Sequence, residues 1–330
     1  MIKGIASILL FGLVQIGWAQ YDPAVGQTGS LAISKDSSII KSWVSHCTLQ
    51  RGYKDIADKS LGLVDYGKQA YVLGFSDPKV LSLGDSGVAT LTYNGIVYNG
   101  PGADFCIFEN SFNDNFLELA HVEVSSNGVD FFRFPSVSLT STQQQKGSFD
   151  LIDPTHINNL AGKHRGQYGT PFDLNDLKDS LLLNTDSITH IRIIDVVGSI
   201  DSSLGSRDGQ GNLINDPYPT AFTNEGYYTG GFDLDAIGLI NYEGEIYLGK
   251  PYLSYDSSIK FYPNPAVNNI NFTNDHIIKK IEVYTLSGIE ILERNNEEIS
   301  SLDVSEFPSG VYILHIYSAD LFSTVRLIKK

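Results

Sequence analysis

Short segments of alternating apolar and polar residues, separated by glycine and asparagine, recur along most of the chain. Clear examples are His121–Ser125, Thr189–Val197 and Phe232–Ile240. Successive side chains of a strand point to opposite faces, so a period of two is typical of half-buried β-strands. A helical pattern occurs at Pro171–Leu177, where Thr170 would cap a short helix. The pattern predicts an all-β protein built as a large, jelly-roll-like β-sandwich.

The first 19 residues have the composition of a secretory signal peptide. Lys3 supplies the positive charge, an apolar run follows, and Gly17 and Ala19 flank a small-residue cleavage site. A transmembrane anchor is the alternative, but the apolar run is shorter than the roughly 20 residues that span a bilayer. No other segment is long and apolar enough to span. We therefore expect a cleaved signal peptide and a soluble, exported protein without a transmembrane segment.

The last seventy residues carry a second targeting signal. Its blocks are Phe261–Pro265, Ile281–Gly288, Phe307–Tyr312 and the closing Val325–Lys330. In order and spacing they resemble the type A C-terminal sorting domain of the type IX secretion system of Bacteroidota. The resemblance implies that the outer-membrane translocon recognises this region, which is commonly removed as the protein is attached to the outer-membrane surface or released. The sorting signal would comprise Pro263, Asn264, Pro265, Gly288, Gly310, Val311, Tyr312, Lys329 and Lys330.

The two ends divide the chain into parts. Residues 260–330 should form a small immunoglobulin-like β-sandwich, because Ile281–Leu292 has the pattern of a hairpin with a two-residue turn. Pro251 and paired serines interrupt the strand pattern before it. We therefore predict a signal peptide at 1–19, a cargo domain at 20–250, a linker at 251–259 and the sorting domain at 260–330.

The chain is strongly acidic, with a formal net charge of −15 from 38 acidic and 23 basic residues. Such a surface repels phosphate backbones, so we expect no nucleic-acid partner. The charge favours solubility outside the cell and is also compatible with binding of divalent cations.

A hairpin in the middle of the chain points to a class of cargo domain. Residues Val122–Phe131 read VEVSSNGVDF. This run resembles a hairpin of galactose-binding-like jelly rolls, the discoidin and carbohydrate-binding architecture, and Phe232–Ile237 is similar to that family's closing strand. The resemblance implies a carbohydrate or other small ligand and, in many members, a structural calcium ion.

Three aspartates are the candidate metal ligands. Asp233 and Asp235 lie two apart on one predicted strand, and Asp195 shares a strand face with apolar residues. A buried carboxylate needs a cation, an arginine or a proton, and calcium takes carboxylate oxygens. The alternatives are a salt bridge with Arg192, Arg133 or Lys163, or exposure at a strand end.

Four aromatic residues form the candidate ligand site. They lie within eleven positions of a segment rich in Pro, Asn and Gly: Tyr218, Phe222, Tyr227 and Tyr228. Aromatic rings on a loop suit stacking on sugar rings, although they also suit packing of the loop onto the sandwich.

Two cysteines, Cys47 and Cys106, lie in the exported part. An oxidising compartment permits a disulfide between them, and two unrelated buried thiols are the alternative.

No catalytic group is assigned. Gly84–Gly87 reads GDSG, as around some serine nucleophiles, but lies where a turn is needed between two strands. The function we expect is a secreted or cell-surface protein that binds carbohydrate or another small ligand. The alternatives are an extracellular hydrolase of glycans or peptides, with a pair such as Glu109 and Asp104, and a structural or adhesion protein.

Overall fold

The computed structural model describes residues 21–224, 226–247, 254–255, 260–273, 277–286, 289–295, 298–318 and 321–330. The predicted signal peptide, most of the predicted linker and Gly288 lie outside these residues. The described part is all-β, as predicted, and contains no α-helix. Its helical elements are four short 3₁₀ turns: η1 (Lys59–Leu61), η2 (Gln69–Val72), η3 (Pro154–His156) and η4 (Leu174–Leu177).

The first large sheet is antiparallel and has six strands. In spatial order five of them are β1 (Ile33–Ser34), β11 (Tyr168–Phe172), β6 (Phe105–Glu109), β15 (Asp233–Leu239) and β2 (Ser42–Trp43). The sixth, β4 (Leu81–Ser82), pairs with the start of β15. Since β6 and β15 are antiparallel, with Glu109 opposite Leu234, the end of β6 lies beside the beginning of β15.

The second large sheet also has six antiparallel strands. Five follow the order β16 (Tyr242–Gly244), β5 (Val88–Val97), β12 (Ile188–Asp195), β7 (Ala120–Ser125) and β8 (Phe132–Arg133). The sixth, β3 (His46–Gln50), pairs with β5. The turn predicted between β4 and β5 is present, since the Gly87 amide donates to the Gly84 carbonyl at 2.7 Å.

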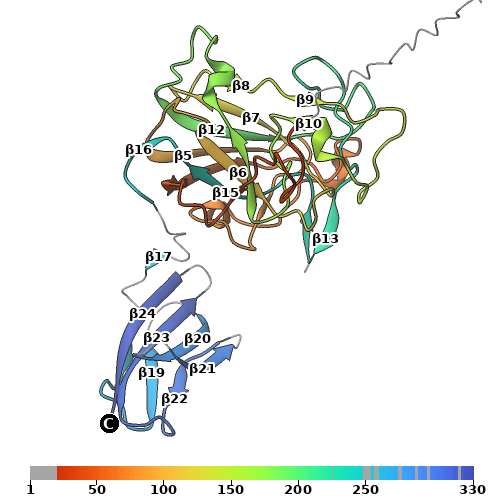
Figure 1. Cartoon of the computed structure of the whole chain (residues 1–330). Coiled ribbons are helices and arrows are strands. Elements are labelled where there is room, and N and C mark those ends of the chain that lie inside the picture. The colour runs from red at the N-terminus through yellow and green to blue at the C-terminus, as the bar shows by residue number, and fades with distance from the viewer. Residues whose placement is uncertain are drawn as a thin grey trace, which may run out of the picture.

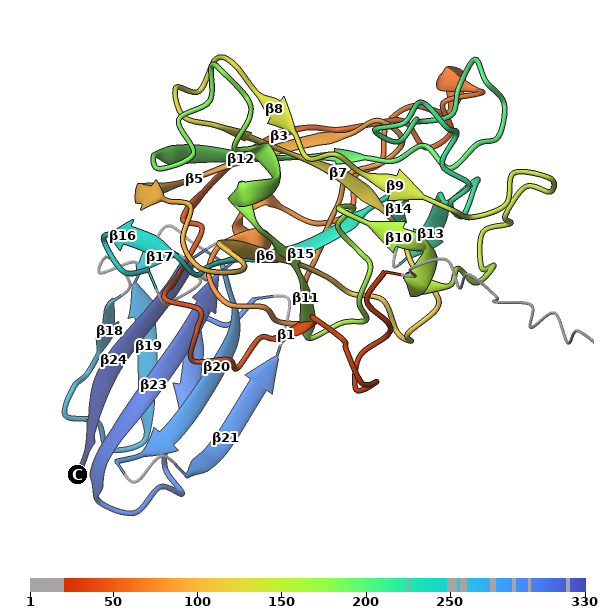
Figure 2. The ribbon, with the colours of Figure 1, turned by 45° about the horizontal axis from the view of Figure 1, so that its top comes forward.

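The two sheets pack face to face around one apolar core (Figures 1 and 2). Phe105, Ile107 and Ile237 enter it from the first sheet, and Leu91 and Ile193 from the second. A smaller apolar cluster, with Trp43, Cys106 and Phe108, covers the other face of the first sheet. As a result β6 is buried on both faces, which explains its uninterrupted apolar sequence.

Two small two-stranded sheets lie outside the two large sheets. The first pairs β9 (Val137–Ser138) with β10 (Ile157–Asn158). The second pairs β13 (Phe222–Asn224) with β14 (Tyr227–Thr229) and contains three of the four predicted ligand aromatics.

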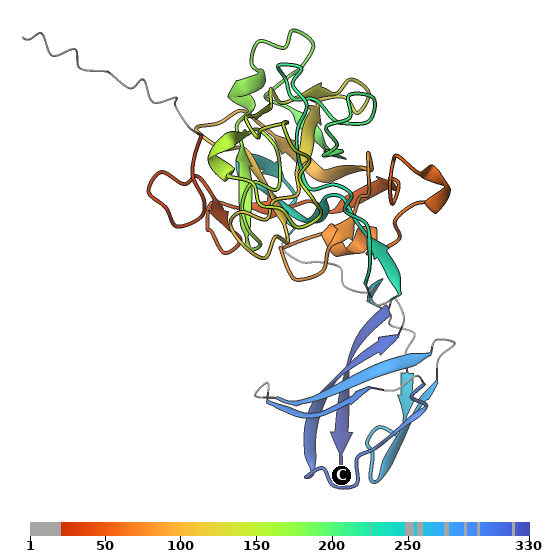
Figure 3. The ribbon, with the colours of Figure 1, turned by 90° about the vertical axis from the view of Figure 1, so that its right-hand side faces the viewer.

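The C-terminal strands form a second, smaller sandwich (Figures 1 and 3). One sheet has the order β17 (Ser254–Tyr255), β24 (Leu321–Lys329), β23 (Gly310–Ser318), β20 (Ile278–Thr285) and β21 (Glu290–Asn295). The other consists of β18 (Lys260–Tyr262), β19 (Asn269–Thr273) and β22 (Ser301–Asp303). Both contribute to an apolar cluster of their own, which includes Ile270, Leu302 and Leu314.

Candidate functional site

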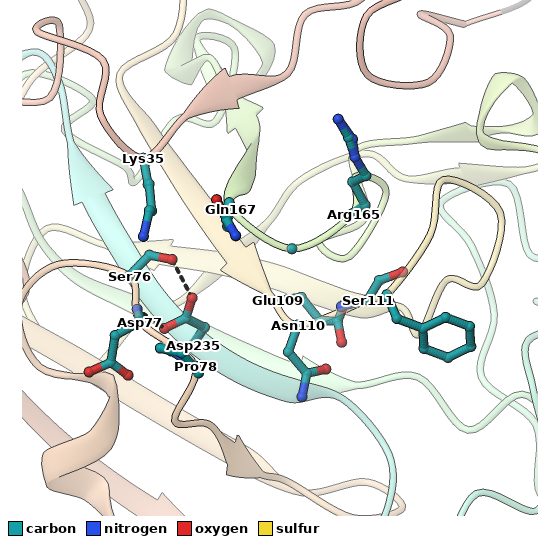
Figure 4. Close-up of a pocket in the computed structure, with 12 residues that line it drawn as sticks. Lys35, Ser76, Asp77, Pro78, Glu109, Asn110, Ser111, Arg165, Gln167 and Asp235 are labelled. Atoms are coloured by element: carbon teal, nitrogen blue, oxygen red, sulfur yellow. Dashed lines mark hydrogen bonds between the residues drawn. The ribbon is translucent and has the colours of Figure 1, made fainter.

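A pocket of about 510 Å³ opens where β6 ends and β15 begins. Glu109 and Asp235 come from these two strands, and Ser76, Lys35 and Phe112 come from neighbouring segments. Figure 4 shows Lys35 and Ser76 above the Asp235 carboxylate, with Glu109 and Asn110 beside it. The antiparallel pairing of β6 with β15 therefore brings two acidic residues to one pocket.

Glu109 is the most constrained group of this pocket. Its side chain is 1% exposed, and Oε2 accepts a hydrogen bond from the Ser111 amide at 2.7 Å. Oε1 has no hydrogen-bond partner among the described residues. Two causes raise the pKa of Glu109 well above its usual value. Burial is the larger, and repulsion from the Asp233 carboxylate is the second. The raised pKa favours the protonated carboxyl group, whose O–H can donate to a ligand.

Two of the predicted metal ligands, Asp233 and Asp235, lie beside Glu109. Asp235 accepts hydrogen bonds from Ser76 Oγ at 2.5 Å and from the Asp77 amide at 3.0 Å. Asp233 accepts from Ser82 Oγ at 2.5 Å. Burial raises the pKa of Asp233 to about 6. A register shift between Leu234 and Ala236 interrupts the ladder at Asp235.

Asp195, the third predicted metal ligand, is buried, as its apolar strand face suggested. Its Oδ1 accepts from the Phe232 amide at 2.7 Å and its Oδ2 from the Ser86 amide at 3.0 Å. The pKa of Asp195 is raised well above its usual value, mainly by burial and secondly by repulsion from the Asp85 carboxylate. Both oxygens of this carboxylate therefore have a backbone amide donor.

Among the described residues, no group of three or more His, Cys, Asp or Glu side chains has a metal-binding arrangement. The contacts of Asp195, Asp233 and Asp235 are instead those of three separate hydrogen-bonded carboxylates. Calcium at these residues stays a prediction from the sequence.

The four predicted ligand aromatics differ in their surroundings. Tyr218 is partly buried, and its hydroxyl donates to Asp55 Oδ1 at 2.6 Å. Tyr228 lies under a lysine, with Lys54 Nζ 3.4 Å from the ring centroid. Phe222 and Tyr227 are about half exposed. Part of the segment therefore packs onto the sandwich, which was the alternative, and part faces solvent.

Phe222 belongs to a row of four phenylalanines whose other members the sequence did not reveal. The rings of Phe112 and Phe116 stack with centroids 4.5 Å apart. Phe116 and Phe149 follow at 6.0 Å, and Phe149 and Phe222 at 6.4 Å. Phe112 is 71% exposed, Phe149 67% and Phe222 50%. This aromatic row (Phe112, Phe116, Phe149 and Phe222) ends at the pocket, because Phe112 also lines it.

Asp104 and Glu109, the two acidic residues suggested as a catalytic pair for a hydrolase, lie far apart. Asp104 directly precedes β6 and Glu109 ends it, so five residues of extended chain, roughly 16 Å, lie between them. Asp104 is buried and accepts from the Gly100 and Leu174 amides at 2.8 and 2.7 Å. Its role is to hold these loops, and the acidic neighbours of Glu109 are Asp233 and Asp235.

Cys47 and Cys106 are free thiols, so the possible disulfide is not formed. Cys47 lies on β3 in the second sheet and Cys106 on β6 in the first. Burial raises the pKa of both thiols, that of Cys47 to about 12. They correspond to the alternative of two unrelated thiols.

The residues of the predicted sorting signal make specific contacts within the small sandwich. Asn264 Nδ2 donates to the Arg326 carbonyl at 2.8 Å, and Asn264 Oδ1 accepts from the Ile328 amide at 2.8 Å. The Tyr312 hydroxyl donates to the Pro308 carbonyl at 2.7 Å. Pro263 and Pro265 flank Asn264 and are exposed, Gly310 and Val311 begin β23, and Lys329 and Lys330 close the chain.

Comparison with known proteins identifies this region. Residues 260–330 match the family described as "Secretion system C-terminal sorting domain". The match supports the type IX sorting domain and implies that it interacts with the secretion machinery. No helix in the described part is long and apolar enough to cross a membrane. The family match indicates that the protein is exported to the cell surface or the extracellular space.

The comparisons say less about the larger sandwich. Similar solved structures include a β-1,2-glucanase from Parabacteroides distasonis, with 11% identity, a TM-score of 0.26 and coverage of 94% of this chain and 39% of that one. Another is a β-glucuronidase from Faecalibacterium prausnitzii, with 12% identity, a TM-score of 0.18 and coverage of 91% and 46%. The chain spans less than half the length of either enzyme, and likeness at these scores carries no functional argument. The comparison with curated protein sequences gave no match.

Proposed function

We propose that this exported protein binds carbohydrate outside the cell, with the aromatic row and the adjoining pocket as its binding site. The observation that carries the proposal is the position of Phe112, which belongs to both. Exposed aromatic rings thereby continue into a pocket that contains buried polar groups.

The aromatic row suits the apolar faces of sugar rings. Exposed phenylalanine rings are unfavourable in water, and large exposed apolar surfaces mark binding sites. Three of the four rings are at least half exposed. The steps between successive centroids, 4.5 to 6.4 Å, make the row longer than one sugar ring. We therefore propose an oligosaccharide rather than a monosaccharide as the ligand.

The pocket supplies the polar contacts that such a ligand needs. Glu109, whose pKa is raised, offers an O–H donor in its protonated form, Asp235 offers acceptor oxygens, and Lys35 offers an ammonium group. Sugar hydroxyls both donate and accept, so a mixed set of this kind can fix their orientation. The resemblance of residues 122–131 to carbohydrate-binding jelly rolls agrees with this proposal.

A glycan array followed by calorimetry on the full chain tests the proposal. Phe112→Ala and Phe149→Ala should each weaken binding about tenfold, since stacking and apolar burial contribute about 1.5 kcal/mol per ring. Tyr262→Ala is the matched control, because Tyr262 is 56% exposed and lies in the sorting domain. An array without a specific glycan, or equal losses for all three variants, contradicts the proposal and favours a structural or adhesion protein.

Glu109 also supports a second candidate, a glycan hydrolase. A general acid needs a carboxyl group that stays protonated at neutral pH, and Glu109 has its pKa raised in this direction. Asp235 would be the second carboxyl group of the pocket. Incubation with the glycans that bind, followed by product analysis, distinguishes the candidates. A hydrolase releases shorter products that disappear with Glu109→Gln, whereas a binding protein returns the glycan intact.

A further inference from the structure

A second cavity, of about 330 Å³, lies where the N-terminal segment crosses the first sheet. Its apolar walls are Leu31 and Ile33 from that segment and Ala103 and Pro171 from the sheet side. Figure 2 shows β1, which contains Ile33, beside β11, which contains Pro171. The cavity shares no lining residue with the pocket of Glu109.

The wall from the N-terminal segment is held by a buried ion pair. Lys163 Nζ donates to Asp22 Oδ1, and Lys163 is 2% exposed. Asp22 Oδ2 also accepts from the Leu31 amide at 3.3 Å. Burial raises the pKa of Asp22, but the contacts of its carboxylate with His164, whose Nε2 lies 3.3 Å from Oδ2, and with Lys163 outweigh burial and lower it to about 2. Asp22 and Lys163 neutralise each other, so neither contributes net charge to the cavity.

Two further carboxylates line the cavity and give it a net negative charge. Asp173 Oδ1 accepts from the Asn175 amide at 2.9 Å, and Asp176 Oδ2 accepts from Asn159 Nδ2 at 2.9 Å. Each uses one oxygen in this way and has no cation partner among the described residues. One oxygen of each therefore remains available as an acceptor.

Thr170 gives an independent sign that the cavity takes a polar group. The side chain is 3% exposed and lines the cavity, and its Oγ1 has no hydrogen-bond partner among the described residues. A buried hydroxyl without a partner costs about 1–3 kcal/mol, so a donor or acceptor supplied by a ligand would remove this cost.

We propose that this cavity binds a primary ammonium group carried on an unbranched aliphatic chain. The aliphatic chain packs against Leu31, Ile33 and Pro171, and the ammonium group donates to Asp173, Asp176 and Thr170. An ammonium group has three donors and no acceptor, which matches three oxygen acceptors. An anionic ligand is excluded because it would lie against two carboxylates. Both a free alkylamine and a lysine side chain carry an ammonium group of this kind.

Titration of the full chain by calorimetry or NMR at low salt tests the proposal, with 1-pentylamine, 1-pentanol and Nα-acetyl-lysine amide as probes. Pentylamine should bind about tenfold more tightly than pentanol, because only the amine can make charge-assisted hydrogen bonds. Comparable binding of the lysine derivative would identify a lysine side chain as the source, and binding of pentylamine alone would identify a free amine. Equal binding of amine and alcohol, or no binding of either amine, would overturn the proposal.

Variants locate the binding at this cavity. Asp173→Asn and Asp176→Asn should each weaken amine binding about threefold to fivefold, as for partly exposed ion pairs. Thr170→Val keeps the shape of the side chain and should weaken it as well. Asp130→Asn is the control, since Asp130 accepts one hydrogen bond, from Asn127 Nδ2, in the loop between β7 and β8. If Asp130→Asn weakens binding as much as the other variants, the amine binds through overall charge and the cavity is not its site.

Discussion

Asp195 and Gly231 lie so close together that a β-carbon at position 231 would be 2.5 Å from Asp195 Oδ1. Gly231 also has a φ of +63°, a conformation that favours glycine. The amide of the next residue, Phe232, donates to the same oxygen. This contact joins the end of β12 in the second sheet to the start of β15 in the first, at the side of the sandwich where the proposed glycan pocket lies.

Gly231→Ala is therefore expected to lower the free energy of unfolding by about 3 kcal/mol, because the backbone strain and the contact with Asp195 add. Gly211→Ala is the matched control. Gly211 has a φ of +86°, but a β-carbon there would meet nothing within 4 Å. The control should lose only about 1 kcal/mol, the cost of the backbone conformation. Urea unfolding measures both, and equal losses would show that the contact with Asp195 is unimportant.

The buried carboxylates should make the protein more stable at mildly acidic pH. Burial raises the pKa of Asp85 to about 7 and that of Asp233 to about 6. In the unfolded chain both groups ionise near pH 4, so between pH 4 and 7 the folded state binds more protons. Stability then falls as the pH rises through this window. The pKa of Asp195, Asp216, Glu109 and Glu118 is raised in the same direction.

The urea midpoint should accordingly be higher at pH 5 than at pH 7.5, because the raised carboxyl pKa values outweigh the opposing effect of His121, whose pKa burial lowers to about 3 and which favours higher pH up to about pH 6.5. Asp22, whose pKa is lowered to about 2, opposes this trend only below about pH 4, where its unfolded form begins to take up protons. Asp233→Asn should reduce the difference between the two pH values, and the exposed Asp130→Asn should leave it unchanged. A midpoint that rises from pH 5 to 7.5 would contradict the assignment of raised pKa values.

The strands were predictable where burial differs between the two faces of a sheet. Residues 189–197 alternate because one face meets the core, and they correspond to β12; residues 121–125 correspond to β7, which is buried on both faces except at Glu123. Pro171 shows the limit of such local reasoning. Its pattern suggested the first turn of a helix, but Pro171 lies in β11 and the helix is reduced to η4, capped by Asp173. β1 pairs only with Tyr168 and Gly169, so β11 is an edge at Pro171 and tolerates a residue without an N–H.

The candidate site was less predictable because long-range pairing assembles it. Glu109 and Asp235 meet only through the register of β6 with β15, which neither segment encodes alone. Phe112 and Phe149 lie on loops, where no periodicity predicts which rings will stack. A dense group of aromatics did reveal Phe222, but its nearest partner in the aromatic row, Phe149, comes from a distant segment.

Replacing Arg51 by lysine should destabilise the fold, although both side chains are positively charged. Its Nη1 donates to the Tyr66 and Ser82 carbonyls at 2.6 and 2.5 Å, and its Nη2 donates to the Gly67 carbonyl at 2.5 Å. The ammonium group of lysine lacks the planar, two-armed geometry with which a guanidinium group can donate to three carbonyls at once. Arg51→Lys is expected to lower the free energy of unfolding by about 2 kcal/mol, since two or more carbonyls lose a charged donor. Arg207→Lys is the control, because the Arg207 guanidinium donates to one carbonyl among the described residues, that of Gly211. Thermal unfolding measures the stability of both variants. An equal loss of stability in both would contradict the role of the Arg51 guanidinium hydrogen bonds.

Asn264 links the start of the sorting domain to its last strand. Its amide side chain makes two hydrogen bonds to the backbone of β24, at Arg326 and Ile328, and so takes the place of a neighbouring strand. The Ala266 amide continues this contact by donating to the Ile328 carbonyl at 2.8 Å. Asn264, a residue of the predicted sorting signal, therefore has a structural role, which is to hold the end of β24 in place.

Asn264→Ala should destabilise the small sandwich by about 1–2 kcal/mol, because it removes both hydrogen bonds from a partly exposed site. Amide hydrogen exchange at Ile328 should accelerate, while exchange at the core amides of β12 stays unchanged. Asn268→Ala is the matched control, since Asn268 is exposed and its side chain makes no hydrogen bond among the described residues. Export of both variants can be followed in the same cells. If Asn264→Ala blocks export while Ile328 exchanges at the normal rate, the secretion machinery reads the Asn264 side chain directly. If exchange and export change together, the machinery depends on the folded end of β24 that Asn264 maintains.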